Sequence, residues 1–171
     1  MRRTAWRWLG AGMAAMILAA SLGACSSQAK GSAHAPAVAA RAVHPVSGLG
    51  VIDLTVTHAG KVHRFRVEVA QTPEQQERGL MFRTAMGPDE GMIFPMPDGR
   101  YASFWMKNTV IPLDIIFIGL DHRILNIAAG AKPYDETPLY SAGPVSGVLE
   151  LNGGRAAQLG IGPGDTVGWQ E

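Results

Sequence analysis

The chain contains a single cysteine, Cys25, among its 171 residues. An intrachain disulfide is therefore excluded, and the fold has to be held together by its hydrophobic core. The formal net charge is +1, but removal of the first 24 residues takes away three arginines and leaves 12 Lys+Arg against 14 Asp+Glu, a net charge of −2. Because no basic stripe remains to follow a phosphate backbone, nucleic acid is not an expected partner.

Familiar catalytic and cofactor motifs are also missing. The sequence has no G-x-S-x-G elbow, no P-loop and no G-x-G-x-x-G after a predicted strand. Its five histidines show no HxxxH or HxH spacing. We expect them to be solvated surface residues, and we predict no metal site and no cofactor. Methionines cluster between residues 81 and 106, but methionine also fills irregular cores, so copper binding is the less favoured interpretation.

The N-terminal region has the layout of an export signal. Three arginines within the first ten residues precede an uncharged apolar run that is shorter than the ~20 residues of a membrane-spanning helix. LGAC at residues 22–25 is similar to a bacterial lipobox, in which Cys25 would carry the lipid that anchors the protein to the membrane. Ser26 then favours the outer membrane, facing the periplasm. The alternative is an ordinary secretion signal that leaves Cys25 as a free thiol.

Composition divides the rest of the chain into a tether and a domain. Residues 26–48 are rich in alanine, serine, glycine and proline and have no sustained period, which is typical of a flexible linker. We therefore predict a lipoprotein signal peptide at 1–24, a lipidated Cys25 followed by a tether to residue 48, and a single domain at 49–171. That domain is long enough to bury one core.

The pattern of the domain predicts short strands and two short helices. Alternating apolar residues predict a β-hairpin from about residue 51 to 69. Thr72, Pro73 and Gln75 are typical of a capping box, which predicts a helix that ends near Arg78. Further strands are expected at 91–96, 101–107, 113–119, 124–130 and 145–154 and after the turn at 161–165, with a turn at 97–100 and a second helix at 153–160. Seven or eight strands with two short helices indicate a mainly β (α+β) domain, built as a curled antiparallel sheet, a sandwich or a barrel.

Four segments resemble, in the same order, the family known as domain of unknown function 192. They are ERGLMFR at 77–83, DEGMIFPM at 89–96, FWMKNTVIPLDIIFI at 104–118, and VLELNGG with LGIGPGD between 148 and 165. The resemblance covers most of residues 62–169. It implies one small, mainly β domain that is often exported behind a signal, and it implies no activity, substrate or cofactor.

The polar and aromatic residues inside these segments are the candidate ligand-binding residues. They are Arg78, Arg83, Trp105, Lys107, Asn108, Asp114, Glu150 and Asn152. In a binding pocket, Lys107 with an arginine would hold an anionic group or a carbonyl beside an aromatic wall. In an enzyme, Glu150 or Asp114 would be a general base. In a structural role, Lys107 would form a buried ion pair with one of these two acids, and this is the interpretation that the sequence favours.

These observations lead to one favoured function and two alternatives. The favoured function is a lipid-anchored envelope protein that binds a small ligand, a glycan or another protein. The lack of catalytic motifs argues against an enzyme, but an envelope hydrolase that uses Glu150 or Asp114 with Lys107 is one alternative. The other is a purely structural or assembly factor.

Overall fold

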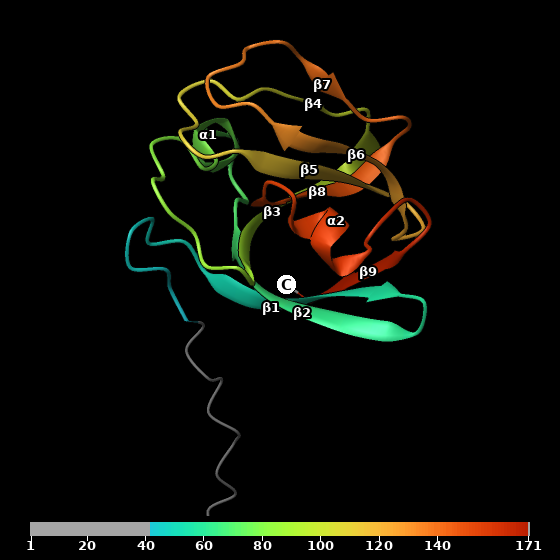
Figure 1. Ribbon diagram of the computed structural model, residues 1–171. Helices are drawn as coiled ribbons and strands as arrows, with labels where there is room; N and C mark the ends of the chain where they lie inside the picture. Colours follow the sequence, from blue (N-terminus) through green and yellow to red (C-terminus); the bar gives the residue numbers. More distant parts are fainter. Residues whose placement is uncertain (1–41, 171) are drawn as a thin grey trace, which may run out of the picture. The chain divides into compact units, whose positions relative to one another are not determined.

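The computed structural model describes residues 42–170 (Figure 1). The predicted signal peptide, Cys25 and most of the predicted tether lie outside the described residues. The elements are β1 (Val51–His58), β2 (Lys61–Val69), α1 (Pro73–Arg78), β3 (Glu90–Arg100), β4 (Ser103–Phe104), β5 (Leu113–Gly119), β6 (Ile124–Ala131), β7 (Leu139–Tyr140), β8 (Val145–Asn152), α2 (Arg155–Leu159) and β9 (Thr166–Trp169). Within this part of the chain, neither helix has the length and apolar character needed to cross a membrane.

Seven of the strands form one curled sheet in the order β6-β5-β8-β3-β2-β1-β9, and β4 and β7 form a separate pair. The sheet is not closed. Its two edges meet at one end, where the Ile124 N–H donates to the Asp165 carbonyl at 2.9 Å and the Val167 N–H donates to the His122 carbonyl at 2.8 Å. The prediction of a single mainly β domain with two short helices is confirmed, and of the three architectures that the sequence left open the structure shows the curled sheet. One detail differs, because β2 and β3 are parallel and the connection between them contains α1.

Local sequence signals account for the first three elements. The β1–β2 hairpin turns at Ala59 and Gly60, which both have positive φ angles, 46° and 80°. The Thr72 hydroxyl accepts from the Gln75 N–H at 3.3 Å, and the Gln75 side chain accepts from the Thr72 N–H at 3.0 Å. This reciprocal capping box confirms the predicted start of α1.

Strand β3 differs most from its prediction. It runs between β2 and β8, and its pairing with β2 ends at Ile93, before Pro95. Because it lacks an N–H, Pro95 is expected at an edge or a bulge, and the ladder with β8 is irregular between Pro95 and Arg100. Residues 97–100, predicted as a turn, belong to this irregular part of β3. Of the predicted strand at 101–107, only β4 forms, and its partner β7 lies in a segment predicted as a loop.

The sheet buries side chains on both of its faces. One core lies inside the curl, which also holds α2 (Figure 1). There Leu54, Phe65, Ile116 and Leu149 pack together with Ala156 of α2. The second core lies on the other face, under α1 and the β4–β7 pair, and contains residues such as Met92, Phe94, Met106, Phe117 and Val148. Side chains alternate along β8. Leu149 and Leu151 therefore face the curl, and Glu150 between them faces the second core.

Candidate functional site

A pocket of about 300 Å³ lies above the second core and reaches Glu150. Its walls come from α1 and the residues after it, from β3, from β4 and the turn that follows, and from β8. The lining residues used below are Glu77, Arg78, Phe94, Arg100, Phe104, Trp105, Lys107 and Glu150. Of the eight candidates selected from the sequence, Arg78, Trp105, Lys107 and Glu150 are brought together here.

Glu150 lies at the buried end of this pocket. It is 5% exposed, and its Oε2 atom makes no hydrogen bond within residues 42–170. Met92 of β3 and Ile115 of β5 flank it in the sheet. Burial raises the pKa of Glu150 to about 8, because the charged form loses its hydration. At neutral pH the group is mostly a protonated carboxyl, which donates a hydrogen bond.

Lys107 is exposed at the mouth of the same pocket. Its Nζ atom lies 5.1 Å from the centre of the Trp105 ring, and it forms no ion pair with any described residue. The buried ion pair with Asp114 or Glu150 that the sequence favoured is therefore wrong. The chain turns at residues 107–108 instead of continuing as a strand, and Asn108 has a φ of 54°. This turn carries the lysine out to the surface.

Asp114 is completely buried and lies on the opposite face of the sheet. Its carboxylate accepts three backbone hydrogen bonds, from Gly130 at 2.8 Å, Gly154 at 2.9 Å and Ala156 at 2.8 Å. These bonds join β6 and the first turn of α2 to β5. Both carboxylate oxygens accept hydrogen bonds, and the pocket is on the other face of the sheet. Asp114 therefore stabilises the fold and does not line the pocket.

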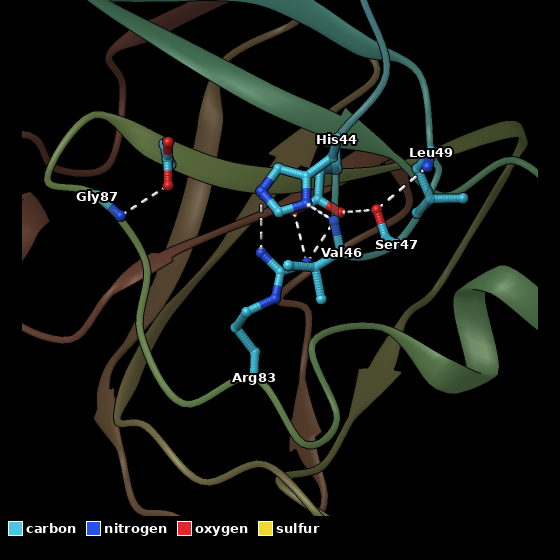
Figure 2. Close-up of polar contacts among 8 residues, drawn as sticks. His44, Val46, Ser47, Leu49, Arg83 and Gly87 are labelled. Carbon is cyan, nitrogen blue, oxygen red and sulfur yellow. Dashed lines mark hydrogen bonds and ion pairs between the residues drawn. The ribbon is translucent and has the colours of Figure 1, made fainter.

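Arg83 belongs to a separate polar cluster (Figure 2). Its Nη2 atom lies 2.8 Å and 3.0 Å from the two carboxylate oxygens of Glu68, and both side chains are at most 10% exposed. The Ser47 hydroxyl also donates to Glu68. Figure 2 shows His44, Ser47 and Arg83 pointing toward one another, with His44 Nε2 at 3.4 Å from Arg83 Nη1. Alternation along β2 predicts that Glu68 faces solvent with Arg64 and Arg66, but it is buried because these three residues cover it.

This cluster also connects the segment before β1 to strand β2. His44 and Ser47 lie in the segment that composition assigned to the tether, yet they contact Glu68 of β2. Val43 forms a β-bridge with Gly50. The Ala42 carbonyl also accepts from the Val51 N–H at 2.7 Å. Described residues ahead of the predicted boundary at residue 49 therefore already contact the domain.

The two candidate asparagines also lie outside the pocket lining. The Asn152 amide donates to the carbonyls of Met86 at 3.2 Å and Gly87 at 2.8 Å, and so connects β8 to the loop before β3. The Asn108 amide lies 3.8 Å from the Met81 sulfur. Both side chains have contacts that account for them without a ligand.

Sequence reasoning missed Phe94 and Arg100 as pocket residues. Phe94 could have been found, because it alternates with Ile93 on β3 and so shares the face of Met92, the partner of Glu150. Arg100 could not have been found in this way, because it follows the bulge in β3, where side chains no longer alternate regularly between the two faces of the sheet.

The histidines differ in part from the prediction of solvated side chains. His63 is only 7% exposed and its Nε2 has no hydrogen-bond partner among the described residues. Burial lowers the pKa of His63, and the positive charge of Lys61 lowers it further. His58 Nδ1 lies 3.1 Å from both carboxylate oxygens of Asp165. Within residues 42–170, no group of three or more His, Cys, Asp or Glu side chains is placed to hold a metal ion.

Comparison with known proteins identifies the family. The model of DUF192, described as an uncharacterized ACR, matches residues 54–169. The chain belongs to the DUF192 family. The matched range contains every residue that lines the pocket, so the pocket lies within the DUF192 domain of this chain.

Two crystal structures are similar to this DUF192 domain. A protein of unknown function from Novosphingobium aromaticivorans DSM 12444 is 61% identical, with a TM-score of 0.74, over 77% of this chain and 94% of that one. A protein from Sinorhizobium meliloti 1021, named as a putative transcription regulator, is 41% identical, with a TM-score of 0.69, over 71% of this chain and 95% of that one. No curated protein matches the chain.

Proposed function

We propose that this DUF192 protein binds a small molecule in the pocket that ends at Glu150. The observation that carries the proposal is the state of that side chain. Glu150 is 5% exposed, and its Oε2 atom lacks a hydrogen-bond partner within the described part of the chain. Buried polar groups in folded proteins nearly always have a partner, and ligand pockets are where a few placed polar groups meet apolar walls.

Glu150 differs in this respect from Asp114, another buried acid of the domain. Asp114 serves the fold, and its carboxylate accepts three backbone hydrogen bonds. Glu150 is buried to a similar degree and receives no such support for Oε2. A carboxyl kept only for the fold would be satisfied as Asp114 is. An unpaired carboxyl at the end of an open pocket is instead the kind of polar group that ligand sites place among apolar walls.

Lys107→Met tests this function directly. We expect the free energy of unfolding to change by less than about 1 kcal/mol, because an exposed cation–π contact with Trp105 is the only described interaction lost. We also expect the variant to lose the thermal stabilisation that pocket ligands give the wild type. The measurement is a thermal-shift screen of the full chain against a library of small anionic, neutral and cationic fragments.

Lys132→Met is the matched control, since Lys132 is exposed and does not line the pocket. It is expected to respond to the fragments as the wild type does. A fall in melting temperature confined to Lys107→Met and comparable to the loss of a buried ion pair would support a structural role instead. An unchanged fragment response in Lys107→Met would also contradict the proposal.

We further propose that the protein is exported and lipid-anchored, with the tether holding the domain off a bacterial membrane, the outer one facing the periplasm where two membranes exist. The support is the arginine-bearing start, the short apolar run and LGAC at 22–25. A membrane-attached binding protein would present its pocket to solutes outside the cytoplasm.

Cys25→Ala is expected to move the protein from the membrane fraction to the soluble fraction of lysed cells, because the lipid-bearing thiol is removed. Wild type should incorporate an alkyne-labelled fatty acid and the variant should not. Ser27→Ala, two residues away, is the control and should remain in the membrane fraction. Unchanged fractionation of Cys25→Ala together with retained labelling would contradict lipidation at this residue.

A further inference from the structure

We infer that the ligand is a small monocarboxylate with a planar apolar body, whose carboxylate accepts a hydrogen bond from the Glu150 carboxyl. This inference rests on the proposed function of the pocket and specifies the class of molecule that enters it.

The charges around the pocket favour an anion. The charged side chains that share it with Glu150 are Glu77 and Arg78 at α1, Arg100 on β3 and Lys107 after β4. All four are exposed, and none forms an ion pair with another described residue. Three positive charges against one negative charge at the mouth attract anions and repel cations. The neighbouring strands place only the apolar Met92 and Ile115 beside Glu150.

The buried end of the pocket favours a carboxylate over a more highly charged anion. A protonated Glu150 supplies a single O–H donor, and a carboxylate is the acceptor with which it forms a short, charge-assisted hydrogen bond. A dianionic phosphate would need several donors to replace its hydration shell. Phe94 and Met96, which also line the pocket, supply no side-chain donor. The Gln76 amide, another lining group, already donates to the Ala70 and Pro95 carbonyls, and the Thr109 hydroxyl donates to the Lys107 carbonyl. One oxygen atom can be satisfied here, and a doubly charged group cannot.

The walls favour a planar apolar body. Phe94 and Phe104 pack edge to face, with ring centres 5.0 Å apart and planes at 87°, and Trp105 is 46% exposed at the rim. Rings of this kind contact flat apolar ligands well. A volume of about 300 Å³ is at the lower end of the range for ligand pockets and suits a single ring with a short substituent.

Three probes of similar shape test the class: benzoate, benzamide and benzylamine, titrated into the full chain by calorimetry at pH 6.5. We expect benzoate to bind at least tenfold more tightly than benzamide, and benzylamine not to bind. Benzoate stays ionised from pH 6 to 9, so its own titration does not interfere. Because burial raises the pKa of Glu150 to about 8, wild-type affinity for benzoate should fall about tenfold per pH unit above that value.

Two variants separate the hydrogen bond from the general charge of the site. Glu150→Gln keeps a donor that does not titrate, so it should bind benzoate equally well at pH 6.5 and pH 9. Glu150→Leu lacks a donor and should bind benzoate at least tenfold more weakly than wild type at pH 6.5. Equal benzoate affinity in wild type and Glu150→Leu, or a wild-type affinity that does not change between pH 6.5 and pH 9, would overturn the inference.

The same experiments distinguish this inference from the proposed function. If benzamide or benzylamine binds more tightly than benzoate, and Lys107→Met weakens that binding, the pocket is a binding site and the monocarboxylate class is wrong. If none of the three probes binds and no library fragment gives stabilisation that depends on Lys107, both the inference and the proposed function are wrong.

Discussion

Glu150→Gln is expected to stabilise the folded protein by about 3 to 5 kcal/mol at pH 8, with little effect near pH 4.5. Burial raises the pKa of Glu150 from 4.5 to about 8 in the folded state, so the folded protein holds this proton more tightly than the unfolded chain does. The resulting stability is fully present below pH 4.5 and is lost as the pH rises through 8. Glutamine has nearly the same shape and does not titrate, so the variant lacks this loss.

The measurement is urea unfolding of both proteins at several pH values across this window. Glu136→Gln is the control, because Glu136 is exposed and outside the pocket, and it should follow the pH dependence of the wild type. Parallel stability curves for wild type and Glu150→Gln would show that Glu150 is not held protonated. A gain in stability, together with altered ligand binding, would identify Glu150 as a residue kept for function at the expense of stability.

Asp114→Ala is expected to lower the free energy of unfolding by about 3 to 5 kcal/mol. The substitution leaves the N–H groups of Gly130, Gly154 and Ala156 without their acceptor, in a place where Asp114 itself is completely buried. Asp114→Asn should lose less, about 2 to 3 kcal/mol, because one acceptor oxygen remains while its amide group opposes an N–H donor. Urea unfolding gives these values, and faster hydrogen exchange at the three amides would locate the damage.

The exposed Asp98 provides the control for this experiment, since it makes no side-chain hydrogen bond with a described residue. Asp98→Asn should change the free energy of unfolding by less than about 0.5 kcal/mol. A loss below about 1 kcal/mol for Asp114→Ala would contradict the structural role of this carboxylate. Affinity for a pocket ligand is expected to be unchanged in Asp114→Asn at temperatures where the variant is folded, because Asp114 lies on the other face of the sheet.

The sequence did not show that substitution of Glu150 and substitution of Asp114 would have opposite effects on stability. Alternation along the strands places Asp114 with Ile116 and Glu150 with Val148, and it says nothing about what covers each face. Asp114 is satisfied by backbone groups that lie 16, 40 and 42 residues away along the chain. Glu150 lies under a pocket whose walls begin 74 residues earlier, at Gln76. Contacts over such separations leave no local pattern.

The sequence also did not show which of the two cations Arg83 and Lys107 is buried and which is exposed. Both are cations within the family-like segments. Lys107 was considered for a pocket or for a buried ion pair, and Arg83 was considered for the pocket. Arg83 forms the buried ion pair, with Glu68 as a partner that alternation had assigned to the solvent face. Lys107 remains exposed at the pocket because the chain turns at Asn108, whose carbonyl accepts a hydrogen bond from the Phe82 N–H at 2.8 Å.

By itself, the sequence determined the first hairpin, the capping box of α1, the buried strand β5 and the mainly β class of the domain. Each of these depends on the alternation of neighbouring residues or on hydrogen bonds between residues at most four positions apart. Only the tertiary structure decided the path of β3, the curl of the sheet and the positions of the polar side chains. Burial and pairing of a charge depend on which distant segments cover it, and those segments meet only when the sheet has formed.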